Sequence, residues 1–296
     1  MATKYKQEIL KQVARATFVV LACALLLGAI VPISVGAQTF KTLYKFKEQD
    51  AASGPNSALV WDAAGNLYGT AGGSPNGEGN GAVFELSPSG EMTFLYTFPG
   101  TNGNGENGAQ PQGVVFGTDG NLYGDTYDGG YNNYGVIFKL TLSGQFTLLY
   151  NFQGSPNDGV APISTPLLPG PSGLFYGATA EGGDGLCRGE NRQGFCGVVF
   201  TVDTSGNETV IHDLQGSPGD GVEPFGNLVQ DVQGNLYGAT MGGGAYPGLL
   251  CGGLSGWNCG AVIKLSPSSG GGWTESLLHS FTGGSEGLVP LSVCHW

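Results

Sequence analysis

The tetrapeptide Asn66-Leu67-Tyr68-Gly69 recurs as Asn121-Leu122-Tyr123-Gly124 and as Asn235-Leu236-Tyr237-Gly238. A degenerate copy, Leu174-Phe175-Tyr176-Gly177, lies between the second and the third copies. The four tyrosines are about 55, 53 and 61 residues apart, and self-similarity at such a spacing is typical of propeller blades and solenoid units. The motif therefore predicts a fold built by repetition of one structural unit.

Four short apolar segments make up each unit. In the first unit they are Ala58–Asp62, the motif itself, Val83–Leu86 and Phe94–Phe98, and we call such segments A, B, C and D in chain order. Their Val, Ile, Phe, Tyr and Thr residues, bounded by Gly, Pro, Asn, Asp and Ser, are typical of half-buried β-strands. Short Gly-containing links join A to B and C to D, as tight antiparallel hairpins require.

This pattern predicts an all-β fold, a β-propeller-like array of four-stranded antiparallel blades. We expect residues 38–296 to form a single repeat domain with full units at about 47–98, 99–152, 153–214 and 215–281. Partial units are expected at both ends, as a D-like strand at Leu43–Phe46 and a partial fifth unit at 282–296. Because strands B and C are missing between these two parts, we expect an incomplete ring. A β-solenoid is the alternative, although it favours shorter, more uniform repeats.

The N-terminal segment differs from the repeats. Four basic residues precede an apolar run from Ala16 to Ile33, and small residues follow at Val35-Gly36-Ala37. This order predicts a signal peptide over residues 1–37, and therefore a secreted, cell-surface or periplasmic protein. The alternatives are an uncleaved membrane anchor and a lipoprotein signal around Cys23.

The chain is acidic, with 11 Lys and Arg against 23 Asp and Glu. Cleavage after Ala37 removes four basic residues and Glu8, which leaves 7 basic against 22 acidic residues and a net charge of −15. Such a surface repels phosphate backbones and anionic lipids. We therefore expect no nucleic-acid partner, and membrane contact only through the signal segment before cleavage.

Four of the six cysteines predict local disulfides. Cys187 and Cys196 lie in the B–C link of the third unit, and Cys251 and Cys259 lie in that of the fourth, whereas the first two units have shorter links without cysteine. A pair that arrives with each longer link favours the bonds Cys187–Cys196 and Cys251–Cys259, formed in an oxidising compartment. Free or metal-binding thiols are the alternative, although neither pair has Cys-x-x-Cys spacing.

The repeat resembles the GloVer tandem repeat of exported bacterial proteins. The matching consensus is Asp-x-x-Gly-Asn-Leu-Tyr-Gly-x-Thr, followed by Gly-Gly and by Gly-x-Val-Phe-x-Leu-x-Pro-x-Gly. It is met at Gly65–Thr70, Val83–Gly90 and Gly234–Thr240, and the resemblance covers nearly all of Thr39–Leu291. The resemblance implies export and propeller-like repeats, and it implies no particular ligand.

The B–C and D–A links are long, Gly-rich and variable, and antiparallel strands place them at the same end of every blade. Binding residues often lie on variable loops of a rigid scaffold. We expect a binding scaffold for an unknown glycan or protein, with a purely structural surface spacer as an alternative. The expected contact residues are aromatic, and packing of these side chains on neighbouring glycines is the alternative interpretation. They are Tyr131, Tyr134, Tyr246 and Trp257.

No catalytic residues, cofactor or metal site are expected from the sequence. His212 and His279 stand where earlier units have Tyr96 and Tyr150, so we interpret them as substitutions at a structural aromatic position. Likewise, Asp-Gly pairs ahead of strand A favour turns over Ca²⁺ ligands. A carbohydrate-active enzyme remains the alternative because four loop carboxylates could serve as a glycosidase pair. They are Asp128, Glu181, Asp184 and Glu190.

Overall fold

The computed structural model describes nine stretches of the chain. They are residues 40–47, 50–52, 54–73, 80–99, 106–162, 166–184, 196–216, 218–245 and 259–283. The chain divides into two compact units, Met1–Thr42 and Leu43–Trp296, and the strands described below lie in the second. The expected signal peptide lies outside the described residues. Within these stretches, no helix has the length and apolar character needed to cross a bilayer.

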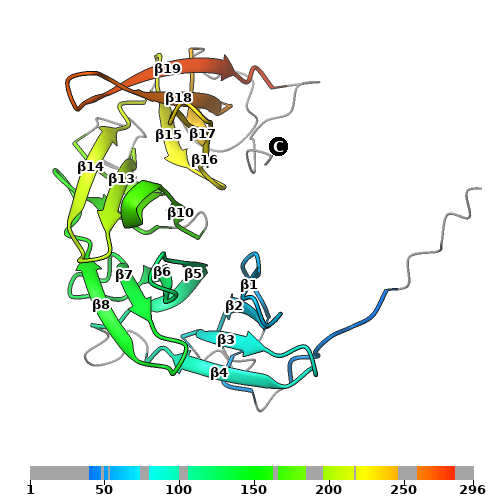
Figure 1. The fold of residues 1–296 in the computed structure, drawn as a ribbon. Coiled ribbons are helices and arrows are strands. Elements are labelled where there is room, and N and C mark those ends of the chain that lie inside the picture. The colour runs from blue at the N-terminus through cyan, green and yellow to red at the C-terminus, as the bar shows by residue number, and fades with distance from the viewer. Residues whose placement is uncertain are drawn as a thin grey trace, which may run out of the picture. The chain divides into compact units, whose positions relative to one another are not determined.

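The second unit contains four antiparallel sheets that follow one another along the chain, and we call them blades 1 to 4 (Figure 1). Blade 1 consists of β1 (Val60–Trp61), β2 (Leu67–Ala71), β3 (Ala82–Leu86) and β4 (Met92–Thr97). Blade 2 consists of β5 (Ala109–Phe116), β6 (Leu122–Asp128), β7 (Val136–Leu140) and β8 (Phe146–Asn151).

Blades 3 and 4 vary this plan. Blade 3 consists of β10 (Leu168–Pro169), β11 (Leu174–Ala178), β13 (Val198–Asp203) and β14 (Glu208–Asp213), and a short 3₁₀ helix, η1 (Pro171–Gly173), joins its first two strands. A separate pair joins β9 (Gly159–Val160) to β12 (Glu181–Gly182). Blade 4 consists of β15 (Gly221–Pro224), β16 (Val229–Gln230), β17 (Leu236–Gly243), β18 (Ala261–Pro267) and β19 (Trp273–Ser280), and β15 and β16 both pair with β17.

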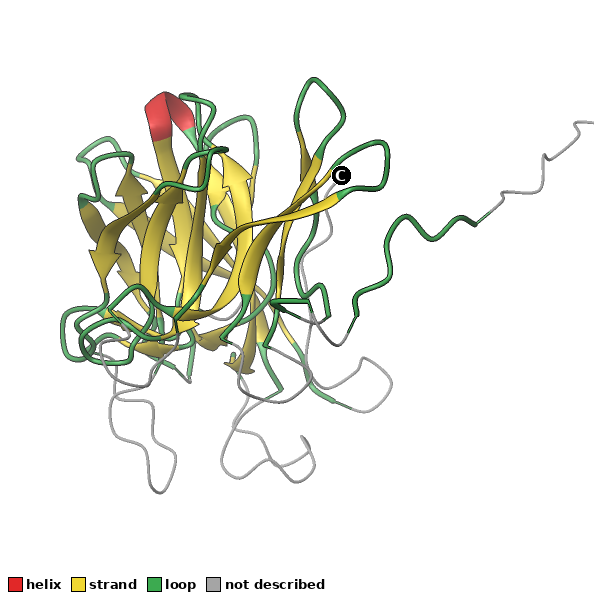
Figure 2. Ribbon diagram, turned by 90° about the horizontal axis from the view of Figure 1, so that it is seen from below, coloured by secondary structure: helices red, strands yellow, loops and turns green. Residues whose placement is uncertain are grey.

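Every blade is an antiparallel meander in the order A-B-C-D, with β15 and β16 together in the place of strand A in blade 4. This order confirms the predicted propeller-like array of four-stranded blades. Strands dominate the ribbon, and η1 is the one helix among the described residues (Figure 2). A solenoid would pair strands of successive units, whereas here the described strands pair inside their own unit, so the solenoid alternative is wrong for this region. The C–D pairing also shifts register once in each blade, beside Phe84, Phe138, Phe200 and Ile263.

One expected strand is not formed. Leu43–Phe46 has no strand structure, because no described strand C lies beside it to supply hydrogen bonds. Its aromatic residues still make contacts, since the Tyr44 hydroxyl donates to Asp50 Oδ2 at 2.9 Å and the Phe46 ring lies 5.7 Å from the Phe84 ring. The expected fifth unit begins at residue 282, and from residue 284 onward it lies outside the described residues.

The recurring Asn-Leu-Tyr-Gly motif closes the A–B hairpin. In blade 1, Asn66 Nδ2 and the Tyr68 hydroxyl both donate to Asp62 Oδ2, at 2.9 and 3.0 Å. Blades 2 and 4 repeat this arrangement around Asp119 and Asp231. These hydrogen bonds lower the pKa of the aspartates, to about 2 for Asp231, although burial opposes the effect most strongly at Asp62 and Asp119. The motif and its aspartate therefore have a structural role.

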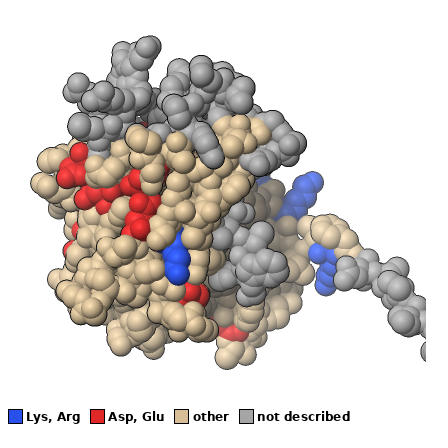
Figure 3. Space-filling model, turned by 90° about the horizontal axis from the view of Figure 1, so that it is seen from above, with Lys and Arg blue, Asp and Glu red and all other residues tan. Residues whose placement is uncertain are grey.

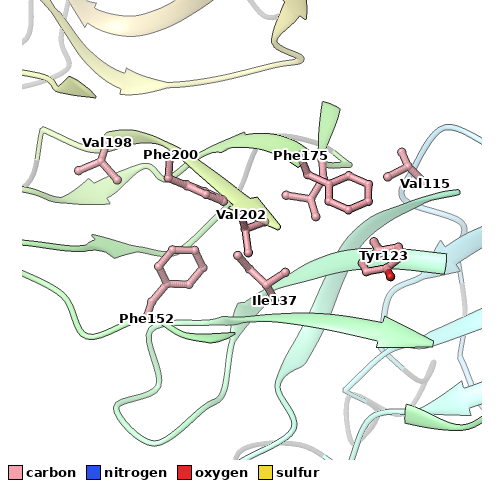
Figure 4. Close-up of a cluster of buried hydrophobic side chains, with 9 residues drawn as sticks. Val115, Tyr123, Ile137, Phe152, Phe175, Val198, Phe200 and Val202 are labelled. Atoms are coloured by element: carbon pink, nitrogen blue, oxygen red, sulfur yellow. The ribbon is translucent and has the colours of Figure 1, made fainter. Parts of the chain in front are cut away.

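The core lies between successive blades. Between blades 2 and 3, Tyr123 packs against Phe175 with ring centroids 4.6 Å apart, and Phe152 meets the edge of Phe200 at 5.3 Å (Figure 4). Equivalent clusters join blade 1 to blade 2 and blade 3 to blade 4. Since each blade buries its faces against its neighbours, aromatic and branched side chains recur at the same strand positions.

Candidate functional site

The two ends of the blades differ in their links. The A–B and C–D links are short hairpins at one end, which in Figure 2 is the end that carries η1. The B–C and D–A links lie at the opposite end, which we call the loop face. Because the strands alternate in direction, all four blades contribute links to this face.

Each blade is tied to the next at the loop face by a repeated backbone contact. Three residues near the start of strand A have positive φ angles, and their N–H groups donate to the B–C link of the preceding blade. They are Gln110 (φ 56°), Ala161 (φ 56°) and Glu223 (φ 51°), which donate to the carbonyls of Asn80, Tyr134 and Cys196. A left-handed conformation is unusual outside glycine, so its recurrence indicates that these contacts fix the loops to the scaffold.

Tyr131 is displayed on a hydrogen-bonded loop of blade 2, between β6 and β7. Its own N–H donates to Asn151 Oδ1 at 3.0 Å, and two positions earlier the N–H of Gly129 donates to Asn133 Oδ1 at 3.0 Å. The Tyr131 side chain is nevertheless 67% exposed. The structure thus combines an ordered backbone with a free aromatic side chain at this position.

The other predicted aromatic contacts have different outcomes. Tyr134 is 37% exposed. Its ring lies close to Gly154, since a β-carbon added to Gly154 would lie 2.7 Å from Tyr134 Cε2. Its carbonyl also accepts a hydrogen bond from Ala161 at 2.9 Å. Tyr134 therefore packs on a glycine, as the alternative interpretation proposed. Tyr246 and Trp257 lie outside the described residues.

Two of the loop carboxylates accept hydrogen bonds from glutamine side chains of neighbouring segments. Asp128 accepts a hydrogen bond from Gln110 Nε2 at 2.8 Å, and Asp184 accepts one from Gln215 Nε2 at 3.0 Å. Glu181 lies in β12, paired with β9, and Glu190 lies outside the described residues. These contacts join Asp128 and Asp184 to neighbouring segments of the chain.

One cysteine of each predicted disulfide lies among the described residues. Cys196 and Cys259 are buried, with 0% and 4% of their surface exposed. Each of them has an interaction partner. Cys187 and Cys251 lie outside the described residues, so the two pairings stay predictions.

Three polar clusters between successive blades were missed by sequence reasoning. In each, a Tyr or His near the end of strand D meets a side chain of the following D–A link and a side chain of the next strand D. We name them by their first residue. The Tyr96 cluster contains Tyr96, Asn107 and Phe146, the Tyr150 cluster contains Tyr150, Asp158 and Glu208, and the His212 cluster contains His212, Asp220 and Glu275.

The first two clusters differ in polarity. Asn107 Nδ2 donates to the Tyr96 hydroxyl at 3.1 Å, and the Phe146 ring stacks on Tyr96 at 4.4 Å. In the Tyr150 cluster, the Tyr150 hydroxyl donates to Asp158 Oδ2 at 2.8 Å, and a glutamate replaces the stacked ring. Burial, with the Asp158 charge as a second cause, raises the pKa of Glu208 to about 7. Carboxyl groups thus replace neutral groups from one cluster to the next.

The His212 cluster combines an imidazole with two carboxyl groups. His212 Nε2 lies 3.3 Å from Asp220 Oδ2. Burial lowers the pKa of His212, but its contact with Asp220 and the charge of Glu275 outweigh burial and raise it. Burial and the neighbouring Asp220 raise the pKa of Glu275 to about 7. Asp220 keeps a lowered pKa, since hydrogen bonds and His212 outweigh burial.

Asp125 is a further acid that the sequence did not single out. It lies in β6, is 2% exposed, and its Oδ1 atom has no hydrogen-bond partner among the described residues. Burial raises its pKa well above the ordinary value. Blades 3 and 4 have Ala178 and Ala239 at this position.

Residues 78–294 match the Gloeobacter/Verrucomicrobia repeat. The chain belongs to this repeat family. The match confirms the resemblance inferred from the Asn-Leu-Tyr-Gly units. No significant sequence match to a curated protein was found.

Several solved structures resemble this Gloeobacter/Verrucomicrobia repeat chain remotely. A protein designated a gluconolactonase has a TM-score of 0.41 and 16% identity over 80% of this chain and 65% of its own. A puromycin hydrolase has a TM-score of 0.45 and 12% identity over 78% of this chain and 30% of its own. An α-L-arabinofuranosidase from Clostridium thermocellum has a TM-score of 0.40 and 15% identity over 76% and 72%. The chain thus spans less than two thirds of the first two proteins, and likeness at this level carries no argument about activity.

An alignment of the repeat units would have revealed the missed clusters. Met92, Phe146, Glu208 and Glu275 share one position of strand D, and the acids appear only in the last two. Asp158 and Asp220 likewise each begin an Asp-Gly pair in the D–A link. In this chain, departures from the unit consensus therefore mark the cluster residues.

Proposed function

We propose that this chain is an exported binding module of the bacterial cell envelope or exterior, whose loop face holds a glycan or a protein partner. The observation that carries the proposal is the exposure of Tyr131, 67%, on a loop whose backbone is hydrogen bonded to Asn151. A tyrosine supplies a large apolar contact with a polar tip and loses little side-chain entropy on binding.

The scaffold supports this role because the described parts of the loop face are hydrogen bonded to it. The N–H groups of Gln110, Ala161 and Glu223 join each blade to the preceding B–C link. A preorganised surface avoids part of the ordering cost that weakens association. At the opposite end, by contrast, the motif aspartates are already engaged with their own hairpins.

The charge of the surface favours an uncharged or basic partner. Asp and Glu side chains gather on one side of the molecule, where few Lys and Arg lie (Figure 3). A neutral glycan or a basic protein segment suits such a surface, and a phosphate-rich polymer does not.

A glycan array probed with the chain from residue 38 onward tests the proposal, followed by titration of each hit. Tyr131→Ala should weaken binding by about 2 kcal/mol, roughly 30-fold, as truncation of an aromatic contact does. Trp61→Ala is the matched control, because Trp61 is 71% exposed and adjoins the A–B link at the opposite end.

The outcomes separate three functions. Binding that depends on Tyr131 and proceeds without turnover supports the binding module. Cleavage of a bound glycan would instead support a carbohydrate-active enzyme. No binding to glycans or to envelope proteins would favour a structural spacer, and loss of binding in Trp61→Ala alone would place the site at the wrong end.

A further inference from the structure

The His212 cluster joins three elements that are far apart in the sequence. His212 lies on β14, Asp220 directly precedes β15, and Glu275 lies on β19. One nitrogen or oxygen atom from each side chain lies within 4.8 Å of the other two. The cluster thus brings an imidazole and two carboxylates to one point between blades 3 and 4.

Two atoms of this cluster are buried without a hydrogen-bond partner in the described part of the chain. They are His212 Nε2, which has the Asp220 carboxylate 3.3 Å away as an ion-pair contact without hydrogen-bond geometry, and Glu275 Oε1. Asp220 is 6% exposed, and the N–H groups of Gln215, at 2.7 Å, and of Gly221 orient its carboxylate. Buried polar atoms normally have partners, because an unpaired one costs free energy. The cluster thus offers three potential metal ligands close together, and two of their atoms lack a hydrogen-bond partner in the described part of the chain.

We propose that His212, Asp220 and Glu275 bind a divalent transition-metal ion, with Zn²⁺ as the ion whose ligand preferences fit best. One imidazole nitrogen and two carboxylate oxygens are ligands that Zn²⁺ accepts. A neutral imidazole with two carboxylates carries two negative charges, which a divalent cation balances. Ca²⁺ fits less well, since it takes six to eight oxygen ligands.

The distances agree with this assignment. Tetrahedral Zn²⁺ with bonds of about 2.0 to 2.1 Å places neighbouring ligand atoms about 3.3 Å apart, and His212 Nε2 lies 3.3 Å from Asp220 Oδ2. The Glu275 oxygen lies within 4.8 Å of both atoms, and a change of side-chain torsion angle can bring it into the set. The fourth position remains for water or for a group of a partner.

The Tyr150 cluster provides a natural comparison inside the same chain. It has carboxyl groups at the same two positions, Asp158 and Glu208. A phenol replaces the imidazole, and its hydroxyl donates a hydrogen bond to Asp158. Glu208 Oε1 is buried without a hydrogen-bond partner in the described part of the chain, as Glu275 Oε1 is, so the unpaired glutamate oxygen is common to the two clusters. The imidazole is what distinguishes the His212 cluster. A neutral imidazole offers a metal-binding nitrogen where the Tyr150 phenol offers a donor, so we place the cation in the His212 cluster and expect none in the Tyr150 cluster.

The test is a Zn²⁺ titration of the chelator-treated chain from residue 38 onward, followed by calorimetry and by the melting temperature. One equivalent should bind and raise the melting temperature. His212→Tyr and Glu275→Gln should each weaken binding by about 100-fold or more, since even partners outside the ligand shell cost 10- to 100-fold. Glu208→Gln is the matched control and should leave Zn²⁺ affinity unchanged. His212→Tyr reproduces the arrangement around Tyr150, so it should fold.

A second measurement on the unaltered chain remains decisive if a variant fails to fold. The chain has three histidines, and the imidazole NMR signals of one of them, His212, should shift on addition of Zn²⁺. Absence of Zn²⁺ binding, binding that both ligand variants retain, preference for Ca²⁺ over Zn²⁺, or no shift of His212 would each overturn the proposal.

Discussion

The Phe138 ring packs against Gly124 of the neighbouring strand so closely that a β-carbon on Gly124 would lie 2.7 Å from Phe138 Cζ. The two residues face each other in the ladder between β6 and β7. Blade 1 repeats the contact between Gly69 and Phe84, where the distance would be 2.9 Å. The glycine that ends the motif is therefore part of the core packing.

Gly124→Ala should lower the free energy of unfolding by about 1 to 3 kcal/mol, because the added methyl group overlaps the backbone carbonyl oxygen of Gly113 and the packed Phe138 ring. Gly238→Ala is the control at the same position of blade 4, where Leu228 Cδ2 at 3.1 Å and Ile263 Cγ1 at 3.8 Å leave more room. Urea denaturation measures both. Equal losses in the two variants would contradict the packing explanation.

Asp125→Ala should raise the free energy of unfolding by about 1 kcal/mol, because it removes a buried carboxyl group with an unpaired oxygen. Alanine already occupies this position in blades 3 and 4. Asp119→Ala should have the opposite effect, since Asn121, Tyr123 and Lys139 all donate to Asp119. Differential scanning calorimetry distinguishes the two signs, and destabilisation by Asp125→Ala would show that its carboxyl group has an important partner.

The stability of the chain should depend on the protonation of Glu208. Its pKa is about 7 in the folded chain against an ordinary 4.5, owing to burial and to Asp158. The folded state thus binds this proton more tightly than the unfolded state. The contribution of Glu208 is fully present below about pH 4.5 and is lost as the pH rises through about 7.

Glu208→Gln should therefore reduce the fall in melting temperature between about pH 5 and about pH 7.5. Glu91→Gln is the control, because Glu91 is exposed on the C–D link of blade 1. If the melting temperatures of Glu208→Gln and the unaltered chain fell in parallel over this range, the role assigned to Glu208 would be wrong.

The disulfides Cys187–Cys196 and Cys251–Cys259 should form in chain made in an oxidising compartment. Each closes a loop of about ten residues, for which the chain-entropy model gives a little under about 3 kcal/mol. Peptide mapping without reduction identifies the partners, and alanine substitution of one pair at a time measures its contribution. A cross-link between the two loops, or free thiols at all four positions, would exclude the local pairing.

The strands and hairpins of each unit could be predicted from local sequence patterns, whereas contacts that need a neighbouring strand could not. The strand order and the hairpins followed from Asn66–Gly69 and its copies, because turn residues and alternating apolar residues act over a few positions. The expected strand at Leu43–Phe46 was wrong although its side chains fit the pattern, because a strand also requires a neighbour to bond with. The place of Tyr131 on a variable loop was visible in the sequence, whereas its exposure was not.

The sequence by itself determined the repeat, the antiparallel blades and the family, since these depend on local hydrogen bonding and on the spacing of identical motifs. Only the tertiary structure decided which residues of different blades meet. Glu275 reaches His212 and Asp220 because strand D of blade 4 packs beside strand D of blade 3. The burial of Asp125 depends in the same way on its surroundings in the folded chain. Contacts between residues about 60 positions apart, and the electrostatics that follow from burial, depend on the assembled blades and are not encoded in any short stretch of sequence.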